Sequence, residues 1–185
     1  MTHLEQYIEK YHAESLEKVK TFFADIMQEL TIYEKAAIYK YTDDDLTHFR
    51  LNNFLRSNQH NTLNELADLI EIALSKLPNY KDVVYRGIEN DLEIVQKYKD
   101  AYENNVPIVE YGFTSTTRLY SIAHQYGSII FEIFGKNGKL IEKISKFGTQ
   151  STINEREILF NRNTHFEVTD FIVFSDYTLI TLNEL

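Results

Sequence analysis

The sequence predicts an α+β fold, in which a helical N-terminal lobe (residues 1–80) packs on a β-rich core (residues 81–185) within a single domain. Up to residue 80, apolar side chains recur at helical spacing, and no glycine precedes Gly87. Beyond residue 80, short apolar runs rich in β-branched and aromatic residues favour strands. The 185 residues are 43% hydrophobic and 14% aromatic, so the chain can bury a substantial core.

Two sets of apolar residues predict helices in the N-terminal lobe. The first set is Leu16, Val19, Phe22, Phe23, Ile26 and Leu30, and the second is Leu63, Leu66, Ile70, Ala73, Leu74 and Leu77. Pro78 is expected to end the second helix, and Thr62 with Glu65 is a candidate capping box at its start.

The β-rich core begins with an expected strand over residues 81–86, which a polar helix over residues 91–104 follows. Later apolar runs predict strands at residues 128–134, 140–144, 157–160, 165–173 and 177–182. Turns are expected at residues 135–138 and 161–163, where glycine and asparagine gather.

Composition excludes several classes of function. The absence of cysteine rules out disulfides and thiolate metal sites, and the six histidines show no ligand-like spacing, so we expect no metal. With 19 basic and 28 acidic residues the net charge is −9, which disfavours nucleic acid as a partner. No run of about 18 apolar residues predicts a membrane span, and the polar N-terminus is unlike a signal peptide. Neither a Walker A sequence nor G-x-G-x-x-G is present.

A pair of carboxylates, Glu155 and Glu157, precedes the apolar residues 158–160. If this segment is extended, both side chains project to one face and one acid acquires a raised pKa. Such a pair suits chemistry in which one carboxylate stabilises a cationic centre and the other accepts a proton. The alternative is a solvated strand edge, on which Glu-x-Glu is common.

Three further polar groups stand out. Arg86 ends an apolar run and needs an anionic partner, either a bound phosphate or an internal carboxylate such as Glu157. Gly87 follows it and permits close approach of a ligand to the backbone. The hydroxyl run from Thr114 to Thr117 includes Ser115, which can orient a carboxylate, although a Thr-rich strand surface explains it equally.

A polar pair in the N-terminal lobe, Asn52 and Arg56, is spaced to share one helix face. An amide and a guanidinium together could hold a pyrophosphate. The alternative is an ordinary polar helix face.

In order, the chain shows Tyr41-Thr42, Leu51-Asn52-x-x-Leu55-Arg56, Tyr85-Arg86-Gly87, Phe113-x-Ser115-Thr116-Thr117 and Glu155-x-Glu157 followed by Ile158-Leu159-Phe160. This ordered set resembles the Arg–Ser–Glu class of bacterial and phage mono-ADP-ribosyltransferases, the exoenzyme family with binary-toxin and C3-like members. The resemblance covers about residues 30–180. It implies the ADP-ribosyltransferase fold, a helical lobe packed on a β-sandwich-like NAD-binding core.

The resemblance implies a role for each matched residue. Glu157 would be the catalytic glutamate, oriented by Ser115 with support from Thr116, and Glu155 would engage an acceptor arginine. Arg86 and the backbone of Gly87 would bind NAD, with Asn52 and Arg56 on its phosphates. Tyr126 is the candidate that stacks on nicotinamide, ahead of Tyr120.

Two positions depart from the family pattern. Thr117 replaces the last serine of Ser-Thr-Ser but keeps a hydroxyl. Thr152 stands where many relatives place a target-recognising aromatic, which leaves the identity of the target open.

The implied function is NAD-dependent mono-ADP-ribosylation of an arginine on a target protein, by a toxin or effector that acts in the cytosol of a host or target cell. A cognate inhibitor or immunity protein stays open as a partner. The alternatives are an NAD glycohydrolase, an enzyme that ADP-ribosylates nucleic acid, and a non-catalytic interaction module with the same fold.

Overall fold

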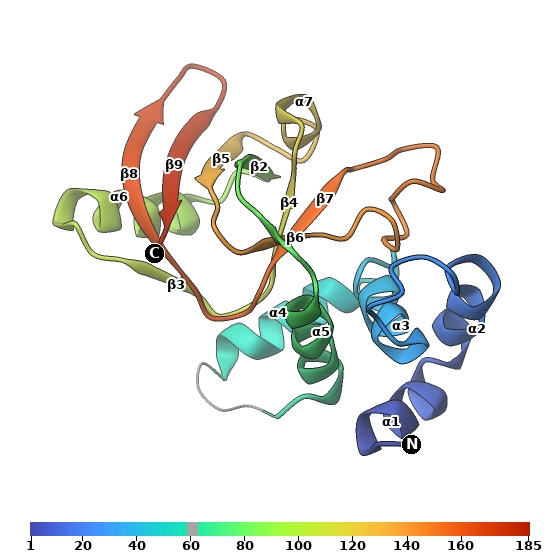
Figure 1. Cartoon of the computed structure of the whole chain (residues 1–185). Helices are drawn as coiled ribbons and strands as arrows, with labels where there is room; N and C mark the ends of the chain where they lie inside the picture. Colours follow the sequence, from blue (N-terminus) through green and yellow to red (C-terminus); the bar gives the residue numbers. More distant parts are fainter. Residues whose placement is uncertain (59–62) are drawn as a thin grey trace.

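The computed structural model describes residues 1–58 and 63–185. Figure 1 shows helices α1–α5 together on one side of a sheet, with α6 against β8 and α7 beside β2 and β4. The chain is therefore α+β, as the sequence predicts. Among the described residues, no helix has the length and apolar character that crossing a membrane requires.

The N-terminal lobe consists of α1 (His3–Tyr11), α2 (Ala13–Phe22), α3 (Ile32–Tyr41), α4 (Thr47–Ser57) and α5 (Glu65–Lys76). Thr31 and Glu34 form a capping box that starts α3. The capping box predicted for Thr62 and Glu65 is not tested, because Thr62 lies outside the described residues; within them, Asn64 caps α5 by accepting a hydrogen bond from Ala67 N at 3.0 Å.

The first predicted helix also ends earlier than its apolar spacing indicates, at Phe22 instead of continuing to Leu30. Lys35, only 2% exposed, donates hydrogen bonds from Nζ to the carbonyl oxygens of Phe23 and Ala24, at 3.2 and 2.8 Å. A cation that binds carbonyl oxygens at the C-terminal end of a helix is a favourable tertiary contact, which a local pattern cannot reveal.

The strands are β1 (Asn79–Tyr80), β2 (Val83–Ile88), β3 (Ile108–Glu110), β4 (Thr114–Thr117), β5 (Ile129–Phe134), β6 (Gly138–Leu140), β7 (Glu157–Phe160), β8 (Thr164–Val173) and β9 (Thr178–Glu184). Helix α6 (Leu92–Asn104) lies between β2 and β3 in the chain, and α7 (Tyr120–Ala123) lies between β4 and β5. The strand predicted at residues 140–144 is wrong, because β6 ends at Leu140 and a turn follows it.

Within the described residues, the strands form one nine-stranded sheet in the order β1-β6-β7-β4-β2-β5-β9-β8-β3. β2 and β4 meet at a single pair of residues, Tyr85 and Thr117, and the sheet folds over at this junction. Its two halves then share one hydrophobic cluster, in which the rings of Phe160 and Phe166 lie 5.8 Å apart. The sandwich-like core is thus one folded sheet.

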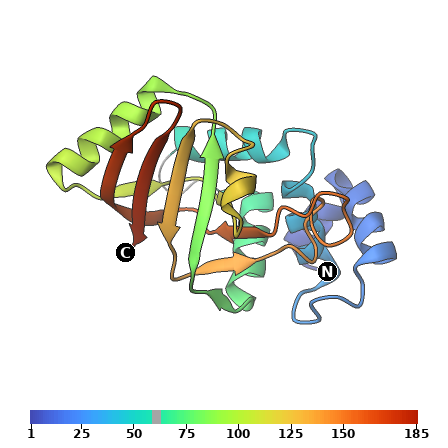
Figure 2. The ribbon, with the colours of Figure 1, turned by 90° about the horizontal axis from the view of Figure 1, so that it is seen from above.

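A second hydrophobic cluster joins the helices to the sheet. It contains apolar side chains of α1–α5 together with Phe113, Ile141, Ile144 and Leu159 from the β-rich part. Seen from above, the orange segment between β6 and β7 lies against the blue helices of the N-terminal lobe (Figure 2). Through Ile141 and Ile144, the segment that precedes β7 therefore packs directly against the helical lobe.

Candidate active site

Glu157 is the first residue of β7, and its side chain is only 4% exposed. The three residues after it, Ile158 to Phe160, are almost completely buried and anchor the strand in both hydrophobic clusters. β7 pairs with β4, where Thr117 lies opposite Glu157. The carboxylate is therefore presented by a rigid strand at the edge of the core.

Serine hydroxyls occupy both oxygens of the Glu157 carboxylate. Ser115 Oγ donates a hydrogen bond to Oε1 at 2.6 Å, and Ser145 Oγ donates one to Oε2 at 2.9 Å. Ser115 pairs with Leu159, two residues beyond Glu157, so the alternation of β4 and β7 puts Ser115 and Glu157 on one face. The predicted contact between Ser115 and Glu157 is thus present.

The pKa of Glu157 is raised to about 7. Burial is the main cause, because it disfavours the ionised form, and the negative charge of Glu155 adds to it. The hydrogen bonds from Ser115 and Ser145 and the positive charge of Arg86 act in the opposite direction. A carboxyl group that titrates near neutrality in a folded protein marks a candidate functional site.

Arg86 lies on β2, next to β4 in the sheet, so the order β7-β4-β2 brings Glu157, Ser115 and Arg86 onto adjacent strands (Figure 1). Its Nη1 donates to the carbonyl oxygen of Ser115 at 3.2 Å. Among the residues that the structure describes, no ion pair joins Arg86 to Glu157. Arg86 therefore affects the Glu157 carboxylate only through its charge at longer range, and it keeps donors for another anion.

The hydroxyl run of β4 ties that strand to the β7 segment. Thr116 Oγ1 donates to the Ile158 carbonyl at 2.7 Å, and Thr117 Oγ1 donates to the Glu155 carbonyl at 2.6 Å. Thr117, where relatives have serine, thus keeps a hydroxyl that positions the backbone of Glu155. The Thr-rich surface that the alternative reading offered is instead buried at these positions.

Glu155 does not lie in the strand, as the alternation argument assumed. β7 begins at Glu157, and Arg156 takes the left-handed backbone conformation with φ 50°. Even so, the two acids remain electrostatically coupled, since Glu155 raises the pKa of Glu157. The half-buried Glu155 side chain accepts a hydrogen bond from the hydroxyl of Tyr126.

The structure shows a packing reason for glycine at position 87, beside the ligand contact that was predicted. A Cβ at this position would lie 1.8 Å from the carbonyl oxygen of Ala123 and 3.3 Å from Tyr126 Cβ. The missing side chain thus admits α7 and the residues after it, including Tyr126, against β2. Contacts of Gly87 and Tyr126 with NAD stay predictions.

We expect Gly87→Ala to destabilise the protein by roughly 2 kcal/mol or more, because the clashing atom belongs to the backbone and cannot rotate away. Thermal or urea unfolding of the variant measures this cost. Glu89→Ala, at an exposed position just past the end of β2, is the matched control and should stay within about 0.5 kcal/mol of the unmodified protein. A Gly87→Ala protein as stable as the control would show that α7 does not need this close contact.

The structure places Asn52 and Arg56 differently from one another. Asn52 is 6% exposed, its Nδ2 donates to the Tyr41 hydroxyl at 3.0 Å, and its Oδ1 accepts from Phe113 N at 2.9 Å. It therefore holds the segment that leads into β4. Arg56 is more open and lies 3.7 Å from a carboxylate oxygen of Glu110.

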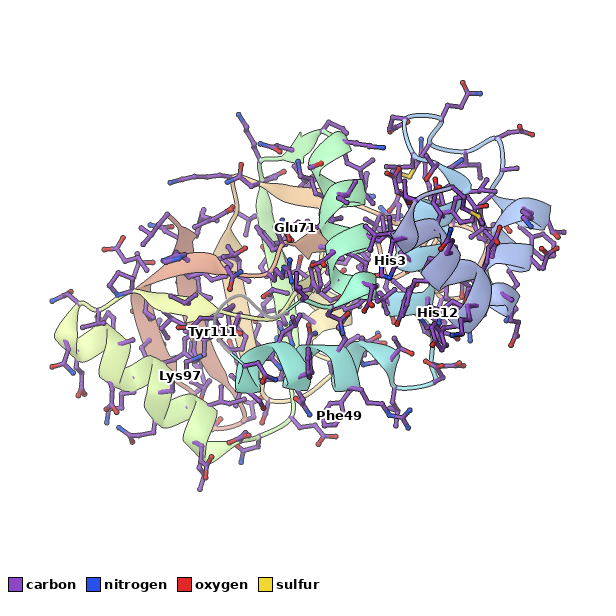
Figure 3. The ribbon with its side chains drawn as sticks, turned by 90° about the horizontal axis from the view of Figure 1, so that it is seen from below. His3, His12, Phe49, Glu71, Lys97 and Tyr111 are labelled. Carbon is purple, nitrogen blue, oxygen red and sulfur yellow. The ribbon has the colours of Figure 1, made fainter. Side chains whose placement is uncertain are left out.

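Glu110 also accepts hydrogen bonds from Lys97 Nζ and the Tyr98 hydroxyl, each at 2.9 Å. Lys97 is labelled on α6, beside α4, in Figure 3. In this arrangement the Arg56 charge is shared with Glu110, and binding of Asn52 or Arg56 to phosphates stays a prediction.

Sequence reasoning missed Ser145 and gave no role to Tyr41. Ser145 lies in the turn after β6, where a strand was expected, and a lone serine carries no sequence signal for a partner 12 residues away. Tyr41 is buried, its pKa is raised to about 12 mainly by burial, and the charge of Glu157 contributes. Tyr41 is therefore close enough to Glu157 to be affected by its charge.

A surface hollow of about 490 Å³ lies elsewhere, at the end of β7 opposite Glu157. Its lining includes Asn161, Thr164 and Glu184. Within it, Glu184 accepts hydrogen bonds from Asn137 in the turn between β5 and β6, and none of the lining residues belongs to the Glu157 site.

Residues 17–183 match the ADP-ribosyltransferase exoenzyme family, and the chain belongs to this family. A curated relative, the putative NAD(+)–arginine ADP-ribosyltransferase Vis of Vibrio splendidus, is 31% identical over 123 residues, which are 60% of this chain and 46% of the relative. The NAD(+)–protein-arginine ADP-ribosyltransferase Tre1 of Serratia proteamaculans is 29% identical over 160 residues, 84% of this chain and 33% of that protein. The chain thus spans less than half the length of these relatives.

Solved structures share the fold. The ADP-ribosyltransferase HopU1 of Pseudomonas syringae superposes with a TM-score of 0.76 at 21% identity, covering 98% of this chain and 87% of that chain. Exoenzyme S of Pseudomonas aeruginosa, solved with human 14-3-3 protein beta and carba-NAD, gives a TM-score of 0.76 at 21% identity, covering 98% and 86%. The predicted fold class and family are confirmed.

Proposed function

We propose that this protein transfers ADP-ribose from NAD⁺ to an arginine side chain of a target protein and releases nicotinamide. One observation carries the proposal: a buried carboxylate, Glu157, is held at both oxygens, with Arg86 and a second acid, Glu155, beside it. The names of Vis and Tre1, both arginine ADP-ribosyltransferases, support the choice of acceptor.

The chemistry requires a fixed negative charge. When the bond between nicotinamide and ribose breaks, positive charge develops on the sugar, and a preorganised carboxylate stabilises it. Glu157 meets this need because the hydroxyls of Ser115 and Ser145 hold it and support its ionised form. Arg86 offers a planar guanidinium to an anionic part of the dinucleotide, in keeping with the phosphate role predicted for it.

The second carboxylate suits the acceptor step. A guanidinium is protonated at all physiological pH values, so a nearby base must take its proton as the new bond to ribose forms. Glu155 is half-buried at the mouth of the site and is held through its backbone by Thr117. Its negative charge also favours the approach of a cationic side chain.

Incubation of the purified chain with labelled NAD⁺ and either agmatine or an arginine-rich protein tests the proposal. We expect nicotinamide release together with label on the guanidinium acceptor, and no label on the amine cadaverine. Label only in free ADP-ribose would instead identify a glycohydrolase, and label lost on nuclease treatment would identify a nucleic-acid acceptor. Calorimetry that detects no NAD⁺ binding would favour a non-catalytic interaction module.

The rate should also depend on pH in a defined way. Because Glu157 must be ionised and its pKa in the free protein is about 7, kcat/KM for nicotinamide release should rise as the pH increases through about 7. Initial rates measured from pH 5 to pH 9 in constant ionic strength give the profile, with the limits of that range chosen about two units either side of the pKa. A flat profile across neutrality would contradict the assigned role of Glu157.

The target protein and the place of action are proposals of the same kind. Action in the cytosol of a host or target cell, and control by a cognate inhibitor or immunity protein, follow from the family resemblance and stay predictions. Mass spectrometry of the labelled acceptor in a cell lysate would identify the target.

A further inference from the structure

Ser145 occupies the oxygen of Glu157 that Ser115 leaves free. Its side chain is 2% exposed, and its Oγ lies 2.9 Å from Oε2, while Ser115 Oγ lies 2.6 Å from Oε1. The terminal torsion of a glutamate is broad, so a single hydrogen bond leaves the plane of the carboxylate free to rotate. Two donors, one on each oxygen, fix that plane.

The two serines reach Glu157 from different parts of the fold. Ser115 belongs to β4 in the sheet, whereas Ser145 belongs to the turn between β6 and β7. This turn begins at Ile141, whose N–H donates to the Glu157 carbonyl at 3.1 Å, and Ser145 N closes it on the Ile141 carbonyl at 2.9 Å. The turn therefore binds both the backbone and the side chain of Glu157.

The helical lobe holds the far end of the turn. Lys146 N donates to Thr42 Oγ1 at 2.9 Å, and Thr42 Oγ1 donates to the Tyr39 carbonyl at the end of α3 at 2.9 Å. Lys146 Nζ adds bonds of 2.6 Å to the carboxylates of Asp43 and Asp44. These contacts connect α3 to the turn at the residue adjacent to Ser145.

A structural role alone would be the competing explanation, because a buried acid needs partners wherever it lies. Ser115 and the backbone of β7 already attach Glu157 to the sheet. Ser145 adds a donor that favours the ionised carboxylate, which is the form that catalysis needs and the form that burial disfavours.

We propose that Ser145 is a positioning residue, whose hydroxyl fixes the orientation of the Glu157 carboxylate and favours its ionised form, and that Thr42 of the helical lobe holds Ser145 in place. The inference rests on the proposed function, and it extends the machinery beyond the Arg, Ser and Glu residues of the family motif. It also gives the helical lobe a direct link to the catalytic acid.

Ser145→Ala is the first test. We expect kcat for nicotinamide release to fall about 10-fold, as for loss of one hydrogen bond to a charged group, with KM for NAD⁺ within about twofold. The acidic limb of the pH profile should move up by about one unit, since removing a donor to the carboxylate raises its pKa. Ser145→Thr, which keeps the hydroxyl, should restore the limb, and Ser75→Ala, on the outer face of α5, should change neither quantity.

Thr42→Val provides a second route that leaves Ser145 intact. It removes the acceptor for Lys146 N, so it should shift the limb in the same direction by a smaller amount. Lower melting temperatures of Ser145→Ala and Thr42→Val, with kcat and the pH limb unchanged, would overturn the inference by assigning both residues a purely structural role.

A measurement without NAD⁺ separates this inference from the proposed function. Carbon NMR of the Glu157 carboxyl, with side-chain-labelled glutamate and Glu157→Gln to assign the signal, gives its pKa directly. An upward shift in Ser145→Ala supports the inference even in a protein that releases no nicotinamide, which would itself refute only the proposed activity. An unchanged pKa overturns the inference, even if the unmodified protein is fully active.

Discussion

Replacing Glu157 by glutamine is expected to lower nicotinamide release from NAD⁺ by about 1000-fold or more. The amide keeps the size of the side chain and can still bond to Ser115 and Ser145, but it removes the negative charge that faces the developing cation. Single-turnover assays with labelled NAD⁺ measure the rate, and calorimetry checks that NAD⁺ still binds. If the variant retained a tenth of the activity, the catalytic role would have to belong to another group.

The same substitution should make the protein more stable at neutral and alkaline pH. Glu157 has a pKa of about 7 in the folded protein against 4.5 in the unfolded chain. Below pH 4.5 both states hold the proton and nothing is lost. As the pH rises from 4.5 to about 7, the unfolded chain releases the Glu157 proton more readily than the folded protein does. The free energy of unfolding therefore falls by on the order of 3 kcal/mol, and the fall is complete above pH 7.

Glutamine does not titrate and escapes this loss. Melting temperatures of Glu157→Gln and the unmodified protein should therefore agree near pH 4 and differ by several degrees near pH 8, with the variant higher. Glu89→Gln, at an exposed position, should show no such divergence. If the difference in melting temperature between Glu157→Gln and the unmodified protein were equal at both pH values, ionisation of Glu157 would not destabilise the folded protein. The prediction illustrates how a functional group can cost stability.

The central part of the site was predictable because its residues lie on or beside segments with a strand-like sequence, which are the apolar runs of β2 and β7 and the Thr-rich run of β4. Arg86, Ser115 and Glu157 lie on β2, β4 and β7, and those strands are neighbours in the sheet. The hydrogen bond between Ser115 and Glu157 follows from strand alternation once that adjacency exists. That the three strands are neighbours could be expected only from the ordered family motif, because no single segment of the sequence indicates it.

The remainder depends on contacts between segments that have no regular period. Ser145 donates to Glu157 from a turn, whereas the apolar run at residues 140–144 predicted a strand there. Asn52 matches the family motif in type and position, yet its amide is used to join Tyr41 to Phe113. At the early end of α2, two carbonyl oxygens accept hydrogen bonds from Lys35, a charged residue that composition alone would place at the surface.

Glu155 is close enough to Glu157 to raise its pKa, but not for the reason that the sequence suggested. The two acids were expected to face the same side of one strand, but the left-handed Arg156 separates Glu155 from β7. Thr117 Oγ1 holds the Glu155 carbonyl, and Glu155 N donates to the Phe147 carbonyl at 2.9 Å. These loop contacts, instead of the pleat of a strand, bring the second carboxylate to the mouth of the site.

This position leads to the second large effect, a separation of the two half-reactions in Glu155→Gln. Transfer to agmatine should fall about 100-fold, since the variant lacks a base for the guanidinium proton. Release of nicotinamide to water should change about fivefold or less, because Glu157 and both of its serine donors are unaltered. Parallel assays of labelled agmatine and free ADP-ribose give the two rates, with Glu103→Gln on the exposed side of α6 as the control.

Since Glu155 bonds to Tyr126 and not to Ser115 or Ser145, equal loss of both rates would mean that the two acids act as one unit and that the division of roles between them is wrong.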